Sequence, residues 1–244
     1  MLESLSGEFL AGLRQLNLSL NEQQLEQFLR YQQELLDWNT HFNLTAITDP
    51  GGVQIKHFLD SLTLLAAYDK PQTRLLDIGS GAGFPGLPLK IVRPAWEITL
   101  LEATGKKVTF LRHVIETLRL DGITVVQGRA EELAHKAAYR VKFDLVTARA
   151  VASLATLLEY SAPFCRVGGR IIFFKKGDLA DELVQGKRAA IQLGATLKAD
   201  VPIELAELAE LADGRRLFVW GQQKFCPLQY PRAGATMAKR SLGE

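Results

Sequence analysis

The chain is poor in the residues that build metal centres, disulfide frameworks and membrane spans. It has two cysteines, Cys165 and Cys226, and four histidines in 244 residues, and neither set has metal-ligand spacing. We therefore expect reduced structural thiols and no bound metal. No uninterrupted apolar run approaches the roughly 20 residues of a membrane-spanning helix, and the acidic N-terminus lacks the basic start of a signal peptide. These absences predict a cytoplasmic protein with no membrane partner.

The net charge is small but unevenly distributed. With 47% hydrophobic and 23% charged residues, the composition suits one core with a small appendage. The formal net charge is +2, yet residues 214–244 hold six Lys or Arg residues against Glu244 alone, which makes +5 there and −3 elsewhere. A polyanion is attracted chiefly to such a C-terminal segment and to local patches that the fold assembles. The alternative is a solvated tail without a partner.

One apolar run leads into a glycine-rich segment that predicts a nucleotide-binding turn. The run 74–78 carries Asp77 near its end, and three glycines follow at alternate positions: Gly79, Gly81 and Gly83. Glycine permits the positive φ angles of a tight strand-to-helix turn, and without a Cβ it lets a ligand lie against the backbone. Glu102 closes the next apolar run, where we expect it to accept hydrogen bonds from a ribose diol.

Two cofactor classes use this layout. The segment 81–86 satisfies the dinucleotide GxGxxG pattern, which is weak by itself. The strand, however, runs into Gly79, and that register gives GxGxG preceded by Asp77, the pattern of S-adenosylmethionine (SAM) pockets. The sequence therefore favours SAM over NAD. A third interpretation is a glycine-rich turn that only packs a helix on a sheet.

The N-terminal part reads as helical. Apolar residues recur at helix spacing, and the segment 19–22 makes a capping box that opens a helix to about Trp38. A polar loop over 39–50 precedes a third helix over about 52–67.

From Arg74 onward, strands and helices alternate. Strands are expected near 74–78, 97–101, 123–127, 143–148 and 170–175, with a helix over about 179–193 and an antiparallel pair at 197–203 and 216–221. This order predicts an α/β fold of the class I SAM-dependent methyltransferase type, Rossmann-like, with a mostly parallel seven-stranded sheet and helices on both faces. We expect an N-terminal helical extension over 1–70, a SAM-binding core over 71–224 and a basic tail over 225–244.

Functional residues are expected just beyond the carboxyl ends of the strands, where open α/β sheets bind ligands. After the third strand, the Ala130 amide and the Glu131 carboxylate are placed to read an adenine edge, although a helix N-terminus also favours acids. Arg149 follows the fourth strand at the mouth of the pocket, with a surface salt bridge as the alternative. Lys175 and Lys176 follow the fifth strand, where they either hold a phosphate or base or mark a solvated strand end.

Three stretches together carry a family resemblance. They are WNTHFNLTAIT at 38–48 with KHFLDS at 56–61, the loop at 77–86 including Phe-Pro-Gly, and ARAVAS at 148–153. The chain resembles the bacterial 16S rRNA guanine-N7 methyltransferases (RsmG, also called GidB) over nearly its whole length. The resemblance implies methyl transfer from SAM to N7 of a guanine in the 530 loop of 16S rRNA, position 527 in the standard rRNA numbering, with S-adenosyl-L-homocysteine as product. It also implies cofactor contacts from Gly79, Phe84, Ala130, Glu131 and Arg149.

The resemblance extends to the C-terminus and implies an RNA partner. The segment 230–242 is similar to the family's basic C-terminal motif, but it lacks a basic residue and prolines that often follow Tyr-Pro-Arg. We expect 16S rRNA to be bound in the 30S subunit or its precursor, by a monomer. The candidate RNA contacts are Lys106, Lys107, Arg112, Lys175, Tyr230, Arg232, Lys239 and Arg240. Phe84, Tyr230 and Trp38 are candidates for stacking on bases, with core packing as the alternative for Trp38.

The expected chemistry needs no catalytic acid or base. Guanine N7 has a lone pair and no proton, so its attack on the sulfonium methyl group depends on proximity and desolvation. Arg149 and Lys175 are therefore positioning candidates. Cys226-Pro227 has the form of a cytosine-C5 methylation nucleophile but lies beyond the last strand, so we do not expect that role. The competing hypotheses are a SAM enzyme with another substrate and a non-catalytic RNA-binding module.

Overall fold

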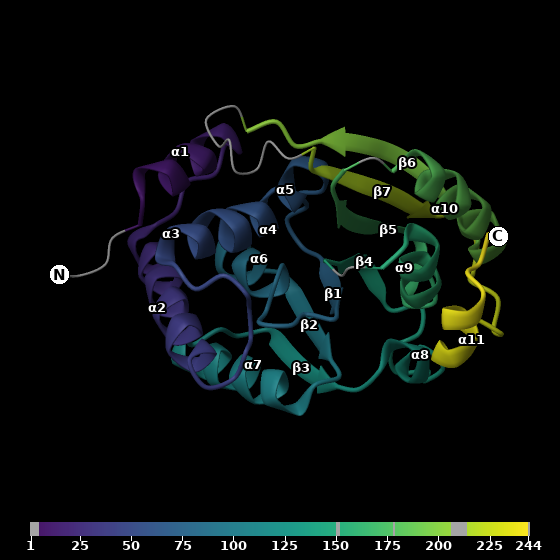
Figure 1. The fold of residues 1–244 in the computed structure, drawn as a ribbon, viewed down its shortest axis with the longest axis horizontal. Coiled ribbons are helices and arrows are strands. Elements are labelled where there is room, and N and C mark those ends of the chain that lie inside the picture. Colours follow the sequence, from purple (N-terminus) through teal and green to yellow (C-terminus); the bar gives the residue numbers. More distant parts are fainter. Residues whose placement is uncertain (1–4, 150–151, 178, 206–213, 244) are drawn as a thin grey trace.

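A mixed seven-stranded sheet organises the protein (Figure 1). The computed structural model describes residues 5–149, 152–177, 179–205 and 214–243. The strand order is β3-β2-β1-β4-β5-β7-β6; β1 to β5 run parallel, and β7 runs antiparallel to both β5 and β6. The strands are β1 (Arg74–Ile78), β2 (Glu97–Glu102), β3 (Ile123–Gln127), β4 (Phe143–Ala148), β5 (Cys165–Lys175), β6 (Ala195–Pro202) and β7 (Arg216–Gln222). The predicted fold class is confirmed, including the antiparallel end.

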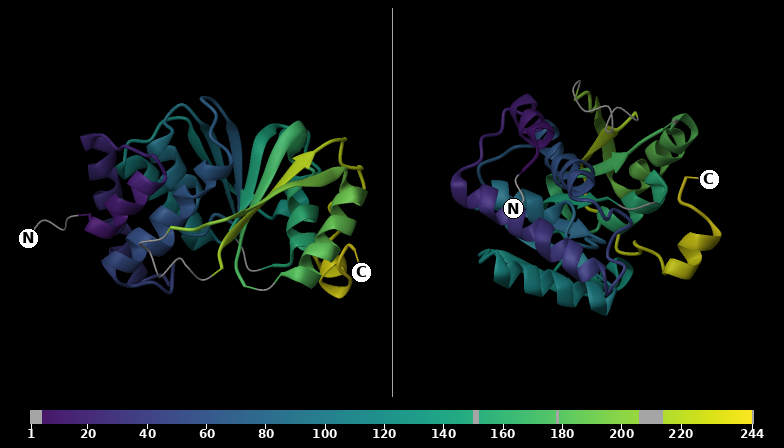
Figure 2. Two further views of the ribbon diagram at one scale, coloured as in Figure 1. Left: turned by 90° about the horizontal axis from the view of Figure 1, so that it is seen from above. Right: turned by 60° about the vertical axis from the view of Figure 1, so that its left-hand side comes forward.

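Helices cover both faces of the sheet, as Figure 2 shows. One apolar cluster contains Leu75 and Leu145 together with residues of α6 and α7, and the other contains Leu76 and Val146 with residues of α8, α9 and α10. Because successive strand residues point to opposite faces, a strand buried on both faces reads as a continuous apolar run. The helices of this part are α6 (Gly86–Val92), α7 (Gly105–Thr117), α8 (Ala130–Leu133), α9 (Leu154–Ser161) and α10 (Ala180–Leu193).

The N-terminal helices share the first of these clusters. They are α1 (Gly7–Gln15), α2 (Glu22–Asn39), α3 (Pro50–Gly52), the π-helix η1 (Val53–Leu59), α4 (Asp60–Leu62) and α5 (Leu64–Ala67). Phe9, Phe28 and Phe58 pack with ring centroids 5.1 to 6.4 Å apart, and Gln24 Nε2 donates to the Ile91 carbonyl at 2.8 Å. The N-terminal region is therefore built into one face of the methyltransferase-like core. Within the described residues, no helix is long and apolar enough to cross a membrane.

The predicted capping box at 19–22 is wrong by two residues. Asn21 is the N-cap of α2: its Oδ1 accepts from Gln24 N at 2.9 Å, and its own N–H donates to Gln24 Oε1 at 3.0 Å. Two overlapping segments fit the same three-residue spacing. The first is not used because Leu18, which is buried and bonded from its N–H to the Leu13 carbonyl at 2.8 Å, belongs to the turn after α1.

The single helix predicted over 52–67 is also wrong in detail. The segment divides into α3, η1, α4 and α5, with one wide π-helical stretch in the middle. Such turns are rare and are often found at functional sites. Here Lys56 and His57 belong to η1 and Asp60 begins α4, and all three line one cleft.

The C-terminal segment is folded against the core. Tyr230, Met237 and Leu242 are buried, and α11 (Gly234–Lys239) lies beside α8 (Figure 1). The Arg140 guanidinium donates to four carbonyls at 2.9 to 3.1 Å, three of them in this segment: Ala134, Tyr230, Cys226 and Pro227. The described part of the basic segment is therefore anchored to the core through its backbone.

Candidate active site

The glycine loop after β1 has room for a ligand on one side and dense packing on the other. Gly79, Gly81 and Gly83 have φ values of +68°, +60° and +105°, which L residues rarely adopt. A Cβ added at Gly79 meets no atom within 4 Å, whereas one added at Gly83 lies 2.6 Å from the Tyr31 hydroxyl. Gly79 therefore leaves open space beside bare backbone, while Gly83 is needed for packing.

Two buried carboxylates lie beneath this loop. Glu102 accepts from Gly81 N at 2.9 Å and from Thr104 N at 2.8 Å, so its oxygens are fixed and each keeps a second lone pair for a ribose hydroxyl. Asp77 accepts from Gly86 N at 3.0 Å through Oδ2, but its Oδ1 is buried without a partner. Burial raises the pKa of Asp77 to about 7. An open glycine cradle beside the fixed carboxylate oxygens of Glu102 fits the ribose end of a nucleoside cofactor.

Ala130 and Glu131 begin α8 beyond β3, as predicted. The Glu131 side chain is 16% exposed, with Arg129 Nη1 3.9 Å from Oε1. The C-terminal segment passes directly over this acid: a Cβ added at Gly234 would lie 2.9 Å from Glu131 Oε1. The predicted adenine end of the pocket is therefore bordered by the start of α11.

Phe84 lies inside a three-ring stack. Tyr31 stacks on it with centroids 5.5 Å apart and planes 22° apart, and His57 stacks on it at 4.3 Å and 16°. Tyr31 and His57 therefore cover Phe84, which is 4% exposed. In this conformation the ring is not open to a base, so the predicted stacking of Phe84 on RNA has no free face.

Arg149 joins the end of β4 to the N-terminal helices. Its Nη1 donates to the Lys56 carbonyl at 3.2 Å and to Asp60 Oδ2 at 3.0 Å, and its Nη2 lies 2.9 Å from His57 Nδ1. Arg215 binds the other oxygen of Asp60 at 2.5 Å. The alternative of an ordinary surface salt bridge does not describe this network, because Arg149 is 18% and Asp60 6% exposed.

The network also fixes the protonation of His57. Arginine only donates, so Nδ1 accepts and the proton resides on Nε2, which lies 2.7 Å from Thr45 Oγ1. Burial, followed by the charge of Arg149, lowers the pKa of His57 to about 3. His57 is therefore a neutral ring at physiological pH.

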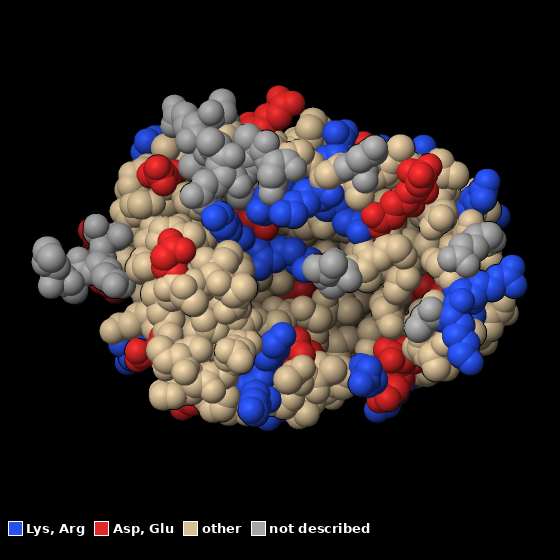
Figure 3. Space-filling view, viewed as in Figure 1, with Lys and Arg blue, Asp and Glu red and all other residues tan. Residues whose placement is uncertain are grey.

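A cleft of about 700 Å³ opens next to this network. Figure 3 shows Lys and Arg atoms gathered along the upper side of the hollow in the middle of this face. Among the described residues that line the cleft, one is acidic, Asp60. The basic lining residues are Lys56, Arg149, Lys175, Lys176, Arg215 and Arg216.

Sequence reasoning missed Arg215 and Arg216 as site residues. It counted them only in the C-terminal charge. Because β7 runs antiparallel to β5, the first residue of β7 pairs with the last of β5, Lys175 with Arg216. The start of β7 therefore lies at the same edge of the sheet as the ends of the parallel strands. Lys56, His57 and Asp60 were visible only as part of the 56–61 motif.

Of the eight candidate RNA contacts, Lys175 lines this cleft, next to Lys176, which was also expected to hold a phosphate or base. Its Nζ donates to the Ala152 carbonyl at 2.6 Å and lies 2.5 Å from Glu182 Oε1, and its side chain is 12% exposed. The ammonium group is therefore held in place, and an incoming phosphate would compete with Glu182 for it.

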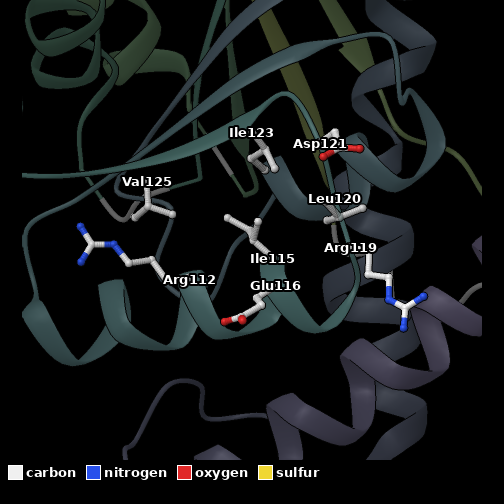
Figure 4. A pocket seen from close by; sticks show the side chains of 8 residues that line it. All are labelled: Arg112, Ile115, Glu116, Arg119, Leu120, Asp121, Ile123 and Val125. Atoms are coloured by element: carbon white, nitrogen blue, oxygen red, sulfur yellow. The ribbon is translucent and has the colours of Figure 1, made fainter.

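The other predicted RNA contacts are dispersed over the surface. Lys106 and Lys107 lie at the start of α7, and Lys239 and Arg240 are exposed at the end of α11. Arg112 lines a separate groove between α7 and the edge strand β3 (Figure 4). These cations do not form one patch.

Arg232 and Tyr230 hold the C-terminal segment in place. Arg232 bonds Glu159, which is 1% exposed, through Nε at 2.8 Å and Nη2 at 2.7 Å. Tyr230 is 8% exposed. An RNA contact from either side chain has to coexist with this packing.

Two further candidates from the sequence, Trp38 and Cys226, pack against other residues of the protein. Trp38 packs among Phe42, Phe110 and His113, which agrees with the alternative of core packing. Cys226 is buried, and burial raises the pKa of its thiol to about 12. Thiolate attack by Cys226 is therefore disfavoured.

Comparison with known sequences identifies the family. Residues 24–205 match the GidB family, described as rRNA small subunit methyltransferase G. A relative from Dehalococcoides mccartyi (strain CBDB1), named Ribosomal RNA small subunit methyltransferase G, is 48% identical over 96% of this chain and 99% of its own. A relative of the same name from Roseiflexus sp. (strain RS-1) is 45% identical over 92% and 94%.

The chain belongs to the GidB family. It is a methyltransferase whose cofactor is SAM, so the family, enzyme class and cofactor expected from the sequence are confirmed. Which residues of this GidB chain contact SAM stays a prediction, and the glycine cradle, Glu102 and the start of α8 are compatible with it.

Solved structures of other proteins share the fold. A methyltransferase from Pyrococcus furiosus is 17% identical with a TM-score of 0.55, covering 79% of this chain and 98% of its own. A mutant of MtNAS in complex with S-adenosylmethionine is 16% identical with a TM-score of 0.53, covering 82% and 73%. At such identities the likeness concerns the fold alone.

Proposed function

We propose that this GidB-family protein transfers the methyl group of SAM to N7 of guanine 527, in the 530 loop of 16S rRNA. The rRNA substrate is supported by the names of the relatives at 45–48% identity. The observation that carries the proposal is the basic cleft, which shares Arg149 and His57 with the network beside the glycine loop. A polyanionic acceptor and the methyl donor would meet at that shared wall.

The cleft is suited to a nucleotide of an RNA chain in size and charge. Its volume of about 700 Å³ lies within the range of roughly 300–1,000 Å³ that is usual for pockets binding drug-sized ligands. Lys and Arg side chains neutralise phosphates and release counterions, which supplies affinity without reading sequence. Selection of one guanine then depends on the contacts between the cleft and the base, and on how the ribosomal particle exposes that base.

The side chains of the site orient the reactants and exclude water. SAM, when bound, supplies an electrophilic methyl group, and guanine N7 attacks it without losing a proton. Three of the five N–H donors of Arg149 bond to Lys56, Asp60 and His57, which fixes the guanidinium and leaves two for a ligand. Asp60 offsets part of the positive charge around a base that becomes cationic. Positioning of the reactants and exclusion of water therefore supply most of the rate acceleration.

The substrate is proposed to be the 30S subunit or its precursor, methylated by a monomer in the cytoplasm. The test is to incubate the protein with tritiated SAM and 30S subunits lacking this modification, followed by borohydride and aniline cleavage, which cuts at N7-methylguanine. Cleavage in the 530 loop is expected, and subunits that already carry the modification provide the control. Label elsewhere, or none despite SAM binding, contradicts the proposal.

A further inference from the structure

The stack of three rings in the candidate active site ends at the basic cleft. Tyr31 lies on Phe84, Phe84 lies on His57, and His57 is the member that lines the cleft. Phe84 is 4% exposed and Tyr31 is fully buried, whereas His57 is half-buried. Of these three rings, His57 is therefore the one that can touch a molecule in the cleft.

Hydrogen bonds fix the orientation of the His57 ring. Nδ1 accepts from Arg149 at 2.9 Å, and Nε2 donates to Thr45 Oγ1 at 2.7 Å. Thr45 is itself held, because its hydroxyl also accepts from Ile47 N at 3.1 Å. With one face on Phe84 and both nitrogens bonded in the ring plane, the second face is the candidate surface for a molecule in the cleft that His57 lines.

We propose that the second face of the His57 ring, opposite Phe84, is the surface on which the target purine stacks, and we call this face the platform. The inference rests on the proposed function, because it requires the acceptor nucleotide to enter the cleft. An aromatic face accepts any base. The charge of the cations that line the same cleft suits the phosphates of the same strand, and these cations are Lys56, Lys176, Arg215 and Arg216.

A neutral platform suits the charge that develops on the base. Guanine gains a positive charge as its N7 takes the methyl group, and a cation over a neutral aromatic face is attracted to the ring. The attraction grows toward the transition state, so it accelerates transfer as well as binding the base. A protonated imidazole would repel the product, and the Arg149 donor at Nδ1 excludes that form. The attraction between the His57 ring and the methylated base thereby offsets part of the repulsion between that base and the surrounding Lys and Arg side chains.

Two substitutions separate this role from a simple positioning role toward Arg149. His57→Phe keeps a ring on Phe84 and loses both hydrogen bonds, whereas His57→Asn keeps an acceptor near Nδ1 and loses the ring. With 30S subunits as substrate, we expect His57→Phe to retain most of kcat/KM. We expect His57→Asn to lose about ten- to hundredfold, the range found when a base–aromatic stack is removed. Isothermal titration should show SAM affinity unchanged in both.

Lys142→Gln, at an exposed position outside the cleft lining, is the control and should keep the activity of the wild type. Thr45→Val removes the acceptor of Nε2 but leaves the ring and its Arg149 contact, so we expect a smaller loss of kcat/KM than in His57→Asn. If His57→Asn is active and His57→Phe is inactive, His57 acts only through its hydrogen bond with Arg149. That outcome contradicts the proposal that the base stacks on His57. If the wild-type protein does not label the 530 loop at all, the proposed function fails and the platform with it. The two failures are thus distinguishable.

Competition by free nucleotides gives a second measurement that does not need the Phe variant to fold. 7-Methylguanosine 5′-monophosphate at mildly acidic pH is a cationic base, and guanosine 5′-monophosphate is the neutral reference. The wild-type protein is expected to be inhibited more strongly by the methylated nucleotide, and His57→Asn to lose that preference. Equal preference in the two proteins overturns the platform.

Discussion

At the scale of single residues, Asp77 contributes to how stability depends on pH. Its folded pKa of about 7 lies above the ordinary value of 3.8 because the carboxyl group is buried. A raised carboxyl pKa means that ionisation of the group destabilises the folded state. This loss of stability is absent below the unfolded pKa, where the group is protonated in both states, and complete above the folded pKa. The contribution of Asp77 to stability therefore declines between about pH 4 and about pH 7.

We expect Asp77→Asn to remove the decline that Asp77 contributes, so that in the protein without SAM the stability at about pH 8 relative to that at about pH 5 is higher in the variant than in the wild type. Urea unfolding at about pH 5 and about pH 8 measures it. Asp37→Asn, at an exposed position on α2, is the control and should leave the difference unchanged. The same decline in Asp77→Asn as in the wild type would assign it to another group.

The neutrality of His57 is a second residue-scale property. Burial and then Arg149 lower its pKa to about 3, and the charged groups facing it are Arg149, Arg215, Lys56 and Asp60. A depressed histidine pKa costs stability as pH falls below the unfolded value, since the unfolded chain binds the proton first. We expect Arg149→Met to raise the pKa of His57, observed by NMR titration of its ring protons. An unchanged midpoint would show that burial alone sets the pKa.

The two glycines of the loop should respond differently to the same substitution. Gly79→Ala forces a left-handed residue at a cost of about 1–2 kcal/mol but meets no atom within 4 Å. Gly83→Ala adds contacts with Tyr31 and Leu87 to the same strain. We expect Gly83→Ala to lower Tm more and Gly79→Ala to lower SAM affinity more, measured by thermal unfolding and isothermal titration. The reverse order would remove Gly79 from the cofactor wall.

At the scale of elements, the C-terminal segment has both an anchor and exposed cations. Arg232 neutralises Glu159, which is 1% exposed. Removing one partner of a buried pair typically costs about 3–5 kcal/mol, because the other charge is left uncompensated. We expect Arg232→Ala to destabilise the protein by several degrees of Tm whether or not RNA is present.

Lys239→Ala is the matched control, because this residue is exposed on α11. It should leave Tm unchanged and weaken binding to 30S subunits if the segment contacts RNA. If both variants keep Tm and lose RNA binding equally, Arg232 is an RNA contact and its pairing with Glu159 contributes little.

At the scale of the whole molecule, the distribution of cations should govern salt dependence. Each phosphate contact contributes to the slope of affinity against salt concentration. We expect KM for 30S subunits to rise steeply with salt and Lys176→Gln, in the cleft, to reduce the slope by about 1. Lys142→Gln, an exposed lysine beside β4 and outside the cleft lining, should not change it. A salt-independent KM would instead favour a small-molecule substrate.

The sequence by itself determined the local features of this protein. The glycine loop after β1, the alternation of strands and helices, the antiparallel end of the sheet and the family were all predicted, because they depend on φ preferences, periodicity and short motifs. Two local patterns were ambiguous. Overlapping capping boxes fit 19–24, and nothing in the residues 52–67 signals a π-helical turn.

Only the tertiary structure decided which cations share a site. Lys56, Arg149, Lys175 and Arg215 come from four distant parts of the chain, and their meeting depends on β7 running antiparallel beside β5 and on the N-terminal helices packing on the sheet. It also decided that Phe84 is covered and that His57 faces the cleft. Charge and aromaticity are properties of a residue, whereas proximity and exposure arise from contacts between residues far apart in sequence.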